Sequence, residues 1–221
     1  MIGVAMEHTR IHTLVVGPVS CNCCIVACPV SGDAAVVDPG GNPELILAEV
    51  AAMGVTVKWL LHTHAHFDHI LATGEVAAAT GAKIFLHEQD RAMYENLPLM
   101  GRVFGFRAAR PPEPSHWLAD GETLAIGSLS ATVIHTPGHT PGSVGFYFAS
   151  PAPVLLAGDT LFAESVGRTD LPGGSFETLA VSIRGKLYVL PGETRVIPGH
   201  GSETTIAHER EHNPFVRAML P

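Results

Sequence analysis

The sequence predicts an α/β domain, because strand-length apolar runs alternate with helical patterns along the chain. Apolar runs over 11–17 and 22–29 open the sequence and are separated by turn residues. Strands predicted over 34–38, 57–61 and 83–86 then alternate with two helical patterns, an order that an all-β barrel does not have. With 46% hydrophobic residues, the 221-residue chain can fill a substantial core.

The helices are predicted from their start and stop signals. Asn42 can cap a first helix with Pro43 at its first position, and apolar residues keep helical spacing until Gly54. A second helix is predicted over 69–80, ending at Gly81. Two further helices are predicted over 175–187 and 204–211.

The rest of the chain is predicted to be strands and one long loop. Residues 96–115 are rich in Pro, Gly and Arg and show no clear period, so we expect a loop that is either a mobile lid or a plain connector. Neither a linker nor a change of composition divides the chain, which predicts a single domain over 1–221. The remaining strands are expected over 122–126, 130–135, 143–148, 154–157 and 195–197.

The charge and hydropathy patterns exclude several function classes. The formal net charge of -8 argues against a protein that grips a nucleic acid backbone, which needs a basic face. The apolar stretches fall short of the roughly 20 residues that span a bilayer. Charged residues interrupt positions 1–17, where a signal peptide needs an unbroken apolar segment. We therefore expect a soluble cytoplasmic protein without a nucleic acid or membrane partner.

The four cysteines all lie between Cys21 and Cys28. Close neighbours along one strand cannot easily form disulfides with one another, which favours a reducing compartment. Cys21 and Cys24 form a C-x-x-C pair, a spacing that also occurs in redox and zinc sites. Without a second pair or a following helix signal, we expect these residues to pack as small apolar side chains.

The run H-A-H-F-D-H at 64–69 is the strongest functional signal in the sequence. It holds His64, His66, Asp68 and His69 directly after the strand predicted over 57–61. Imidazole is the commonest protein metal ligand, and a carboxylate binds the same divalent ions. The run therefore predicts a metal site at the rim of a sheet.

Three later segments repeat the same arrangement. In each, an apolar strand ends in a glycine-containing turn that carries one ligand-type residue, and these residues are His139, Asp159 and His200. Because strand ends on one rim of a sheet converge in space, the three side chains can join the run at 64–69.

These segments resemble the metallo-β-lactamase superfamily over nearly the whole chain: the histidine run, T-P-G-H-T at 136–140, G-D-T-L-F at 158–162 and P-G-H-G at 198–201. The resemblance implies a four-layer αββα sandwich with the site at the edge between two β-sheets. It also implies two divalent ions, zinc as the first choice and iron as an alternative, including a single iron. By position, one ion takes His64, His66 and His139, the other takes Asp68, His69 and His200, and Asp159 bridges both.

Within the superfamily the chain resembles the short-form, glyoxalase II-like group. The G-D-T-L-F segment followed by G-R-T-D at 167–170 is similar to that group, but the C-terminal helical domain of long-form glyoxalase II is missing. The resemblance implies hydrolysis of S-lactoylglutathione or another small thioester by a metal-bound hydroxide, which Asp68 orients as a catalytic residue. Arg168 is a candidate to bind a substrate carboxylate, with a loop-bracing role as the alternative.

Two other functions stay open at this stage. Persulfide dioxygenases are similar in the same segments and use a single iron, whose ligands here would be His64, His139 and Asp159. A non-catalytic metal-binding module on the same fold is the other alternative, although a degenerate scaffold is expected to lose some ligand positions.

Several histidines outside these segments are expected to be structural. The sequence H-E-R-E-H at 208–212 matches the zinc-protease pattern H-E-x-x-H, but its charged residues favour a solvated helix face. His62, His87 and His135 lie at predicted strand ends near the site, where supporting roles compete with ordinary core or rim packing.

Overall fold

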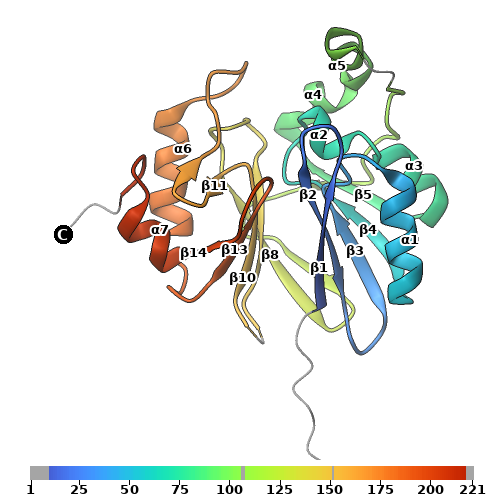
Figure 1. Ribbon diagram of the computed structural model, residues 1–221, viewed down its shortest axis with the longest axis horizontal. Helices are drawn as coiled ribbons and strands as arrows, with labels where there is room; N and C mark the ends of the chain where they lie inside the picture. Colours follow the sequence, from blue (N-terminus) through green and yellow to red (C-terminus); the bar gives the residue numbers. More distant parts are fainter. Residues whose placement is uncertain (1–9, 106–107, 151, 218–221) are drawn as a thin grey trace, which may run out of the picture.

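The computed structural model describes residues 10–105, 108–150 and 152–217. It forms four layers, in which two six-stranded sheets lie face to face and helices cover both outer faces (Figure 1). The four-layer αββα prediction is confirmed by this arrangement.

The first sheet contains, in spatial order, β1 (Arg10–Val16), β2 (Cys21–Ala27), β3 (Asp33–Val37), β4 (Thr56–Leu61), β5 (Lys83–His87) and β6 (His116–Leu118). The second contains β14 (Thr204–Thr205), β13 (Arg195–Pro198), β10 (Val154–Gly158), β9 (Val144–Phe148), β8 (Leu129–His135) and β7 (Thr123–Ile126). A small hairpin pairs β11 (Leu161–Phe162) with β12 (Ser165–Val166).

The helices are α1 (Pro43–Met53), α2 (Phe67–Ile70), α3 (Thr73–Thr80), the 3-10 turn η1 (Glu88–Asp90), α4 (Arg91–Glu95), α5 (Leu97–Phe104), α6 (Phe176–Ser182), the π-helical turn η2 (Ile183–Leu187) and α7 (Ile206–His212). In Figure 1, α1 and α3 cover the first sheet, and α6 and α7 cover the second.

Alternating side chains assign each strand residue to one of the layers. On β3, Val36 packs against α1 and α3, while the next residue, Val37, faces the second sheet. On β10, Leu155 packs toward α6 and α7, and Leu156 packs between the sheets. Strands buried on both faces explain why the sequence shows continuous apolar runs there rather than alternation.

The strands that carry the functional segments end at one edge of the two sheets. Strands β3, β4, β5 and β6 run parallel in the first sheet, and β10 and β13 run parallel in the second. The chain therefore leaves β4, β10 and β13 at their carboxyl ends, which is where open α/β sheets place ligand sites.

The first helix begins and ends where the sequence predicts, but the predicted side-chain cap by Asn42 is wrong. Pro43 opens α1, and Asn42 precedes it with a left-handed φ of 48°. Gly54 ends the helix at φ 66° and donates its backbone N–H to Ala51 O and Val50 O. Asn42 makes no side-chain cap on α1; instead its Oδ1 accepts from Gly17 N at 2.8 Å.

Three element predictions were wrong in part. The helix predicted over 69–80 begins earlier and breaks between Ile70 and Thr73, because residues 67–70 form a separate short helix, α2. The predicted loop over 96–115 contains helix α5, where Pro98 occupies the first turn and tolerates helix geometry. The helix predicted over 204–211 starts at Ile206, after the two residues of β14 that pair with β13.

The cysteine prediction agrees with the structure. All four cysteines are buried and free. Cys21 and Cys23 face the α1 side of the first sheet, whereas Cys24 and Cys28 face the second sheet. Cys21 and Cys24, the C-x-x-C pair, lie on opposite faces of β2 and cannot pair with each other, and all four cysteines pack within the two core clusters.

The expectation that positions 1–17 are not a signal peptide falls partly outside the described residues, which begin at Arg10. Among the helices of the described part, none has both the length and the apolar character that crossing a membrane requires.

Candidate metal centre

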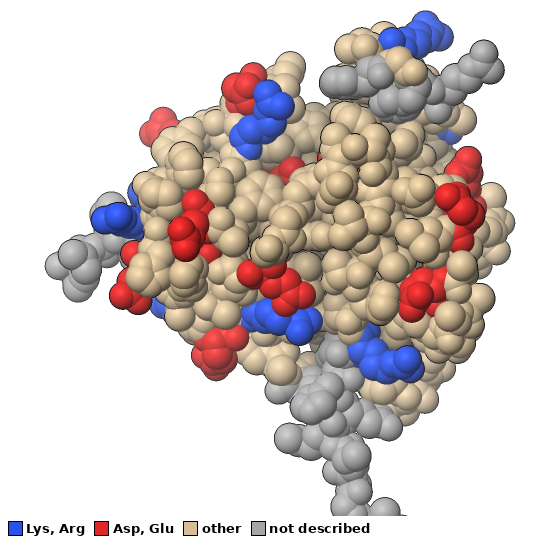
Figure 2. Space-filling model, in the orientation of Figure 1, with Lys and Arg blue, Asp and Glu red and all other residues tan. Residues whose placement is uncertain are grey.

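All seven predicted ligand side chains lie together at one edge of the two sheets. His64 and His66 lie in the segment between β4 and α2, and α2 itself carries Asp68 and His69. The second sheet contributes the others: His139 from the β8–β9 turn, Asp159 directly after β10, and His200 directly after β13. The surface between α6 and α2 is mostly uncharged, with acidic and basic side chains toward its edges (Figure 2).

His64, His66 and His139 form a first group whose ring nitrogens point at one another. His66 Nδ1 lies 2.8 Å from His139 Nε2, which in turn lies 3.2 Å from His64 Nε2. The three donor atoms lie within 4.8 Å of one another, a separation that suits one metal ion.

Asp68, His69 and His200 form a second group of the same size. His200 Nε2 lies 3.1 Å from Asp68 Oδ2 and 3.2 Å from His69 Nε2. His69 is completely buried, and the side chain of His200 is about a quarter exposed (26%). This group therefore lies on the solvent side of the centre through His200.

Asp159 lies between the two groups. Its Oδ1 is 3.4 Å from His69 Nε2, and its Oδ2 is 3.5 Å from His139 Nε2. Asp159 Oδ1 is buried and has no hydrogen-bond partner. A buried carboxylate oxygen without a hydrogen-bond partner is costly, so this atom is suited to a cation held between the two groups.

Hydrogen bonds behind the rings fix which nitrogen carries the proton. His139 Nδ1 donates to Arg168 O at 2.7 Å, His200 Nδ1 donates to Ser20 O at 3.1 Å, and His69 Nδ1 faces Asp38 Oδ2 at 3.0 Å. In the neutral form of each ring, Nε2 is therefore the unprotonated nitrogen, and it is turned inward, as in metal-bound histidines.

His64 is held in the same way through a relay. Thr63 Oγ1 donates to Asp38 Oδ2 at 2.6 Å. Because its proton is used in that bond, Thr63 Oγ1 accepts from His64 Nδ1 at 3.1 Å. Thr63 N also donates to Asp38 Oδ1 at 2.7 Å. Asp38 thus orients one ring of each group, His69 directly and His64 through Thr63.

Asp38 is a functional residue that the sequence analysis missed. Asp38 opens the D-P-G-G segment at 38–41, which breaks the strand pattern before α1 and does not itself mark Asp38 as a site residue. Asp38 is buried and adopts a left-handed φ of 52°. Strained backbone of this kind at a non-glycine residue is typical of functional sites, but it is visible only in the structure.

The arrangement fits divalent cations. With their Nδ1 protons bound outward, neutral His64 and His139 rings turn two lone pairs toward each other at 3.2 Å, and so do His69 and His200 once both are neutral. Facing lone pairs repel unless a positive charge lies between them. A set of imidazoles and carboxylates accepts zinc, iron and manganese alike, so the donor set does not choose the metal.

His64 and His66 are neutral at physiological pH. Burial lowers the pKa of His64 well below 6.5, and the neighbouring His69 lowers it further. Burial, with the adjacent His139, lowers the pKa of His66 to about 3. Both rings can therefore offer lone pairs without first losing a proton.

The second group attracts positive charge. Burial opposes protonation of His69, yet Cys21, Asp159 and Asp38 together raise its pKa well above 6.5. Burial also opposes protonation of His200, but Asp68 and Asp159 raise its pKa overall. In the metal-free protein a proton occupies the place that a cation would take.

This difference predicts how metal is lost on acidification. Protons compete with metal below the pKa of each ligand, which is raised for His69 and His200 and lowered for His64 and His66. We therefore expect an ion bound by the second group to be lost at a higher pH than an ion bound by the first group. Dialysis at stepped pH with metal analysis measures this, and loss of both ions in one step would contradict it.

Arg168 lies beside the centre but is engaged by a neighbour. Its Nε and Nη2 each donate to Asp170, to Oδ1 and Oδ2, at 2.8 Å. Both side chains are mostly exposed, at 61% and 68%. It is the backbone carbonyl of Arg168, not its side chain, that contacts His139.

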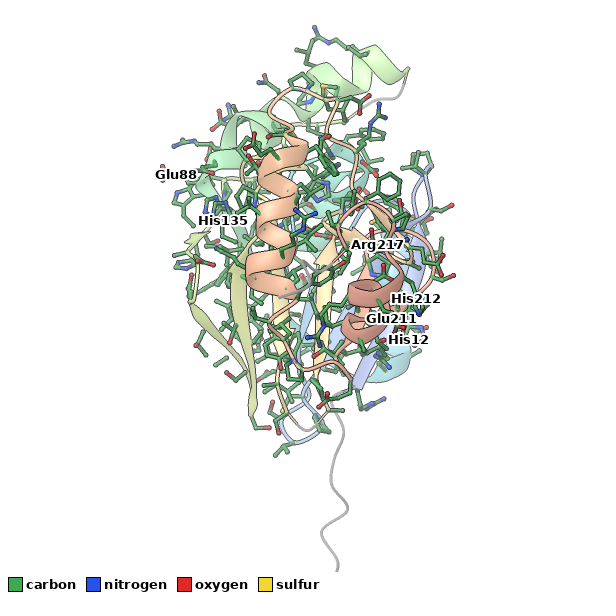
Figure 3. All side chains as sticks on the ribbon, turned by 90° about the vertical axis from the view of Figure 1, so that its left-hand side faces the viewer. His12, Glu88, His135, Glu211, His212 and Arg217 are labelled. Atoms are coloured by element: carbon green, nitrogen blue, oxygen red, sulfur yellow. The ribbon has the colours of Figure 1, made fainter. Side chains whose placement is uncertain are left out.

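Three of the other histidines lie outside the centre. His62 is buried and satisfied, with Nδ1 facing Phe85 O and Nε2 facing Thr73 Oγ1. His87 stacks on His135 with ring centroids 4.2 Å apart, and His135 Nε2 donates to Pro141 O. Figure 3 shows His135 on the same side of the molecule as Glu88.

The H-E-x-x-H segment lies on α7, in the outer helical layer. Figure 3 shows Glu211 and His212 on this helix, facing outward. His208 pairs with Glu164 at 3.0 Å, which is a surface contact. The prediction of a solvated face is wrong for Glu209, which is completely buried and accepts from Glu164 N, Thr204 Oγ1 and Asn213 Nδ2.

Comparison with known proteins gives one family. The model of the metallo-beta-lactamase superfamily matches residues 16–200. Hydroxyacylglutathione hydrolase GloC of Haemophilus influenzae is 38% identical over 188 residues, which cover 84% of this chain and 88% of that protein. Probable metallo-hydrolase YqgX of Bacillus subtilis is 38% identical over 207 residues, which cover 92% of this chain and 96% of that protein.

Solved structures agree with the fold. BLEG-1 B3 metallo-beta-lactamase has a TM-score of 0.87 and 37% identity, covering 94% of this chain and 99% of that one. TTHA1623, solved in a di-iron-bound form, has a TM-score of 0.84 and 38% identity, covering 92% and 99%. ETHE1 from Myxococcus xanthus is more distant, with a TM-score of 0.76 and 26% identity, covering 94% and 84%.

Proposed function

Because the chain belongs to the metallo-beta-lactamase superfamily, we propose that it is a two-metal hydrolase of small thioesters of the S-lactoylglutathione type. The seven side chains that would hold the metals are His64, His66, Asp68, His69, His139, Asp159 and His200. Support for the substrate class comes from the 38% identity to a hydroxyacylglutathione hydrolase.

The observation that carries the proposal is the pair of side-chain groups that share Asp159. Each group supplies three donor atoms, and the carboxylate of Asp159 lies between the two groups. The second group is open to solvent through His200. A metal held by few protein ligands keeps a position for water, which distinguishes a catalytic from a structural site. A pair of divalent ions here would supply a hydroxide at neutral pH and polarise a carbonyl oxygen.

The residues of the chain have separable tasks in such a reaction. Burial opposes ionisation of Asp68, but the hydrogen bond from His200 and the charge of His69 lower its pKa to about 2. Asp68 is therefore an ionised acceptor at neutral pH, able to orient the attacking water through a hydrogen bond. A thiolate is a good leaving group, so a strong general acid is not needed.

Substrate recognition has one candidate outside the metal ligands. Arg168 could bind a substrate carboxylate through the Nε and Nη2 face that now pairs with Asp170. A carboxylate ligand would have to displace Asp170 from that face. The mostly uncharged surface between α6 and α2 is where the thioester would approach (Figure 2).

A persulfide dioxygenase is the second candidate function. The likeness to ETHE1 from Myxococcus xanthus favours it, at 26% identity. A single iron would use His64, His139 and Asp159, which the structure also brings together. The hydrolase ranks first because the second group is equally complete and the hydrolase relative is nearer in sequence.

Metal analysis beside two assays tests the proposal. We expect protein purified without added metal to hold about two ions per chain and to hydrolyse S-lactoylglutathione. Oxygen consumption with glutathione persulfide and one iron per chain would overturn the hydrolase in favour of the dioxygenase. Unchanged hydrolysis after His66→Ala would instead show that the centre is not catalytic.

A further inference from the structure

We propose that Asp90 is the positioning residue that holds His64, His66 and His139 as one unit through their backbone turns. Asp90 is not a predicted ligand, and the sequence analysis did not single it out. The proposal rests on the two-metal centre proposed above, because it names what keeps the first group of that centre in place.

Asp90 ends the turn η1 and is 1% exposed. Its carboxylate accepts three hydrogen bonds from two separate segments. Ala65 N donates to Oδ2 at 3.0 Å, Thr140 Oγ1 donates to Oδ2 at 2.8 Å, and Gly142 N donates to Oδ1 at 2.7 Å.

The three donors lie next to the ligands of the first group. Ala65 stands between His64 and His66, and Thr140 directly follows His139. The first segment leaves β4 of one sheet, and the second joins β8 to β9 of the other sheet. A single carboxylate therefore ties the two sheets together at the point where their ligands must meet.

The turn after His139 is shaped around this carboxylate. A Cβ atom on Gly142 would lie 2.6 Å from Asp90 Cγ and 2.7 Å from Asp90 Oδ1, so only glycine lets its N–H approach. Ser143 Oγ accepts from Thr140 N at 3.1 Å and lies 2.7 Å from Thr140 Oγ1, which keeps that hydroxyl directed at Asp90.

A carboxylate suits this place better than an amide of the same shape. Burial raises the pKa of Asp90, and the hydrogen bonds from Thr140, Gly142 and Ala65 oppose that effect. Three converging donors need an acceptor with two oxygens. Asparagine would turn an NH2 group toward at least one of them and push the two segments apart.

The buried carboxylate of Glu209 provides a matched control. It is completely buried and also accepts from three residues, but these are Glu164, Thr204 and Asn213, none of them within two positions of a predicted ligand. Asp90→Asn and Glu209→Gln therefore each replace a buried carboxyl group by an amide. The first change lies beside the metal centre, and the second lies away from it.

The test is a Co²⁺ titration of the metal-free full chain, followed by visible absorption, with thermal unfolding measured in parallel. We expect Asp90→Asn to weaken the affinity for one Co²⁺ about 10–100-fold and to alter its absorption bands. Glu209→Gln should titrate like the unaltered chain even if its melting temperature falls.

Gly142→Ala approaches the same contact from the other side. It should weaken the binding of the same Co²⁺ ion. The double variant should lose less binding free energy than the sum of the two single losses, because both substitutions disrupt the same contact. An unaltered titration for Asp90→Asn would overturn the proposal. So would an equal loss in Glu209→Gln, which would show that general destabilisation is the cause.

The readout also separates this proposal from the proposed function. Metal binding is measured without any thioester, so absence of hydrolysis in the unaltered chain would reject the substrate class and leave the role of Asp90 standing.

Discussion

Replacing Asp159 with alanine is expected to abolish thioester hydrolysis almost completely and to reduce the metal content from about two ions per chain to one or fewer. Asp159 is the side chain that approaches both ligand groups, at 3.4 Å from His69 Nε2 and 3.5 Å from His139 Nε2. In the proposed two-metal centre, its loss would remove a ligand from each ion, together with the negative charge that the two groups share.

The size of the effect follows from what metal ions contribute to hydrolysis. They supply several kcal/mol of transition-state stabilisation, and about 4 kcal/mol corresponds to about a 10³-fold change in rate. We therefore expect kcat/KM to fall at least ~10³-fold, measured with S-lactoylglutathione beside metal analysis.

Asp159→Asn separates charge from shape at the same position. Asparagine keeps one coordinating oxygen, so we expect it to retain more metal than alanine while losing most of the activity. Glu193→Ala, at an exposed position in the turn before β13, is the control for purification and folding. Full activity in Asp159→Ala would show that the two groups do not act as one centre.

Replacing Asp38 with asparagine is expected to have the second-largest effect, although Asp38 is not itself a predicted ligand. Its carboxylate accepts from Thr63 N and Thr63 Oγ1 and faces His69 Nδ1. The amide cannot satisfy all three donors, and it removes the negative charge that favours a positive centre beyond His69. Replacing a residue that hydrogen-bonds to a metal ligand typically lowers metal affinity or activity about 10–100-fold.

Stability should fall together with metal affinity. Leaving a buried donor unsatisfied costs about 1–3 kcal/mol, so denaturant unfolding of the metal-free Asp38→Asn chain should show a loss of that order. Asp33→Asn, at the start of the same strand β3, is the matched control and should change neither property. Metal affinity within twofold of the unaltered chain would contradict the relay through Thr63 and His69.

The seven predicted ligands were accessible to sequence reasoning because each follows a recognisable strand. His64 comes three residues after Leu61, the end of β4, and Asp159 and His200 follow β10 and β13 within one or two residues. A strand that ends in a turn places its next side chain at the sheet edge, whatever the rest of the chain does. That rule needs only local information.

Asp38 and Asp90 could not be found in this way. Asp38 lies 25 positions from Thr63, and Asp90 lies 50 positions from Thr140. Each appears in the sequence as an ordinary turn carboxylate, in D-P-G-G and in H-E-Q-D. Their roles depend on which backbone N–H groups the packed sheets bring to them.

The helix α5 was missed for a related reason. Its residues 97–104 combine Pro98 and Gly101 with apolar residues, a composition typical of loops. Proline is tolerated in a first helical turn, and packing of α4 and α5 against their neighbours decides the outcome. Tertiary contacts thus overrode the local signal.

The sequence by itself determined the fold class, the order of most strands and which residues could bind metal. These properties follow from periodicity and from the position of polar residues at strand ends, both of which are local. Only the tertiary structure decided that outward hydrogen bonds turn the ring nitrogens inward, and that Asp38 and Asp90 hold the ligands in place. Those features arise from contacts between the two sheets, and contacts between segments far apart in the chain exist only after the chain has folded.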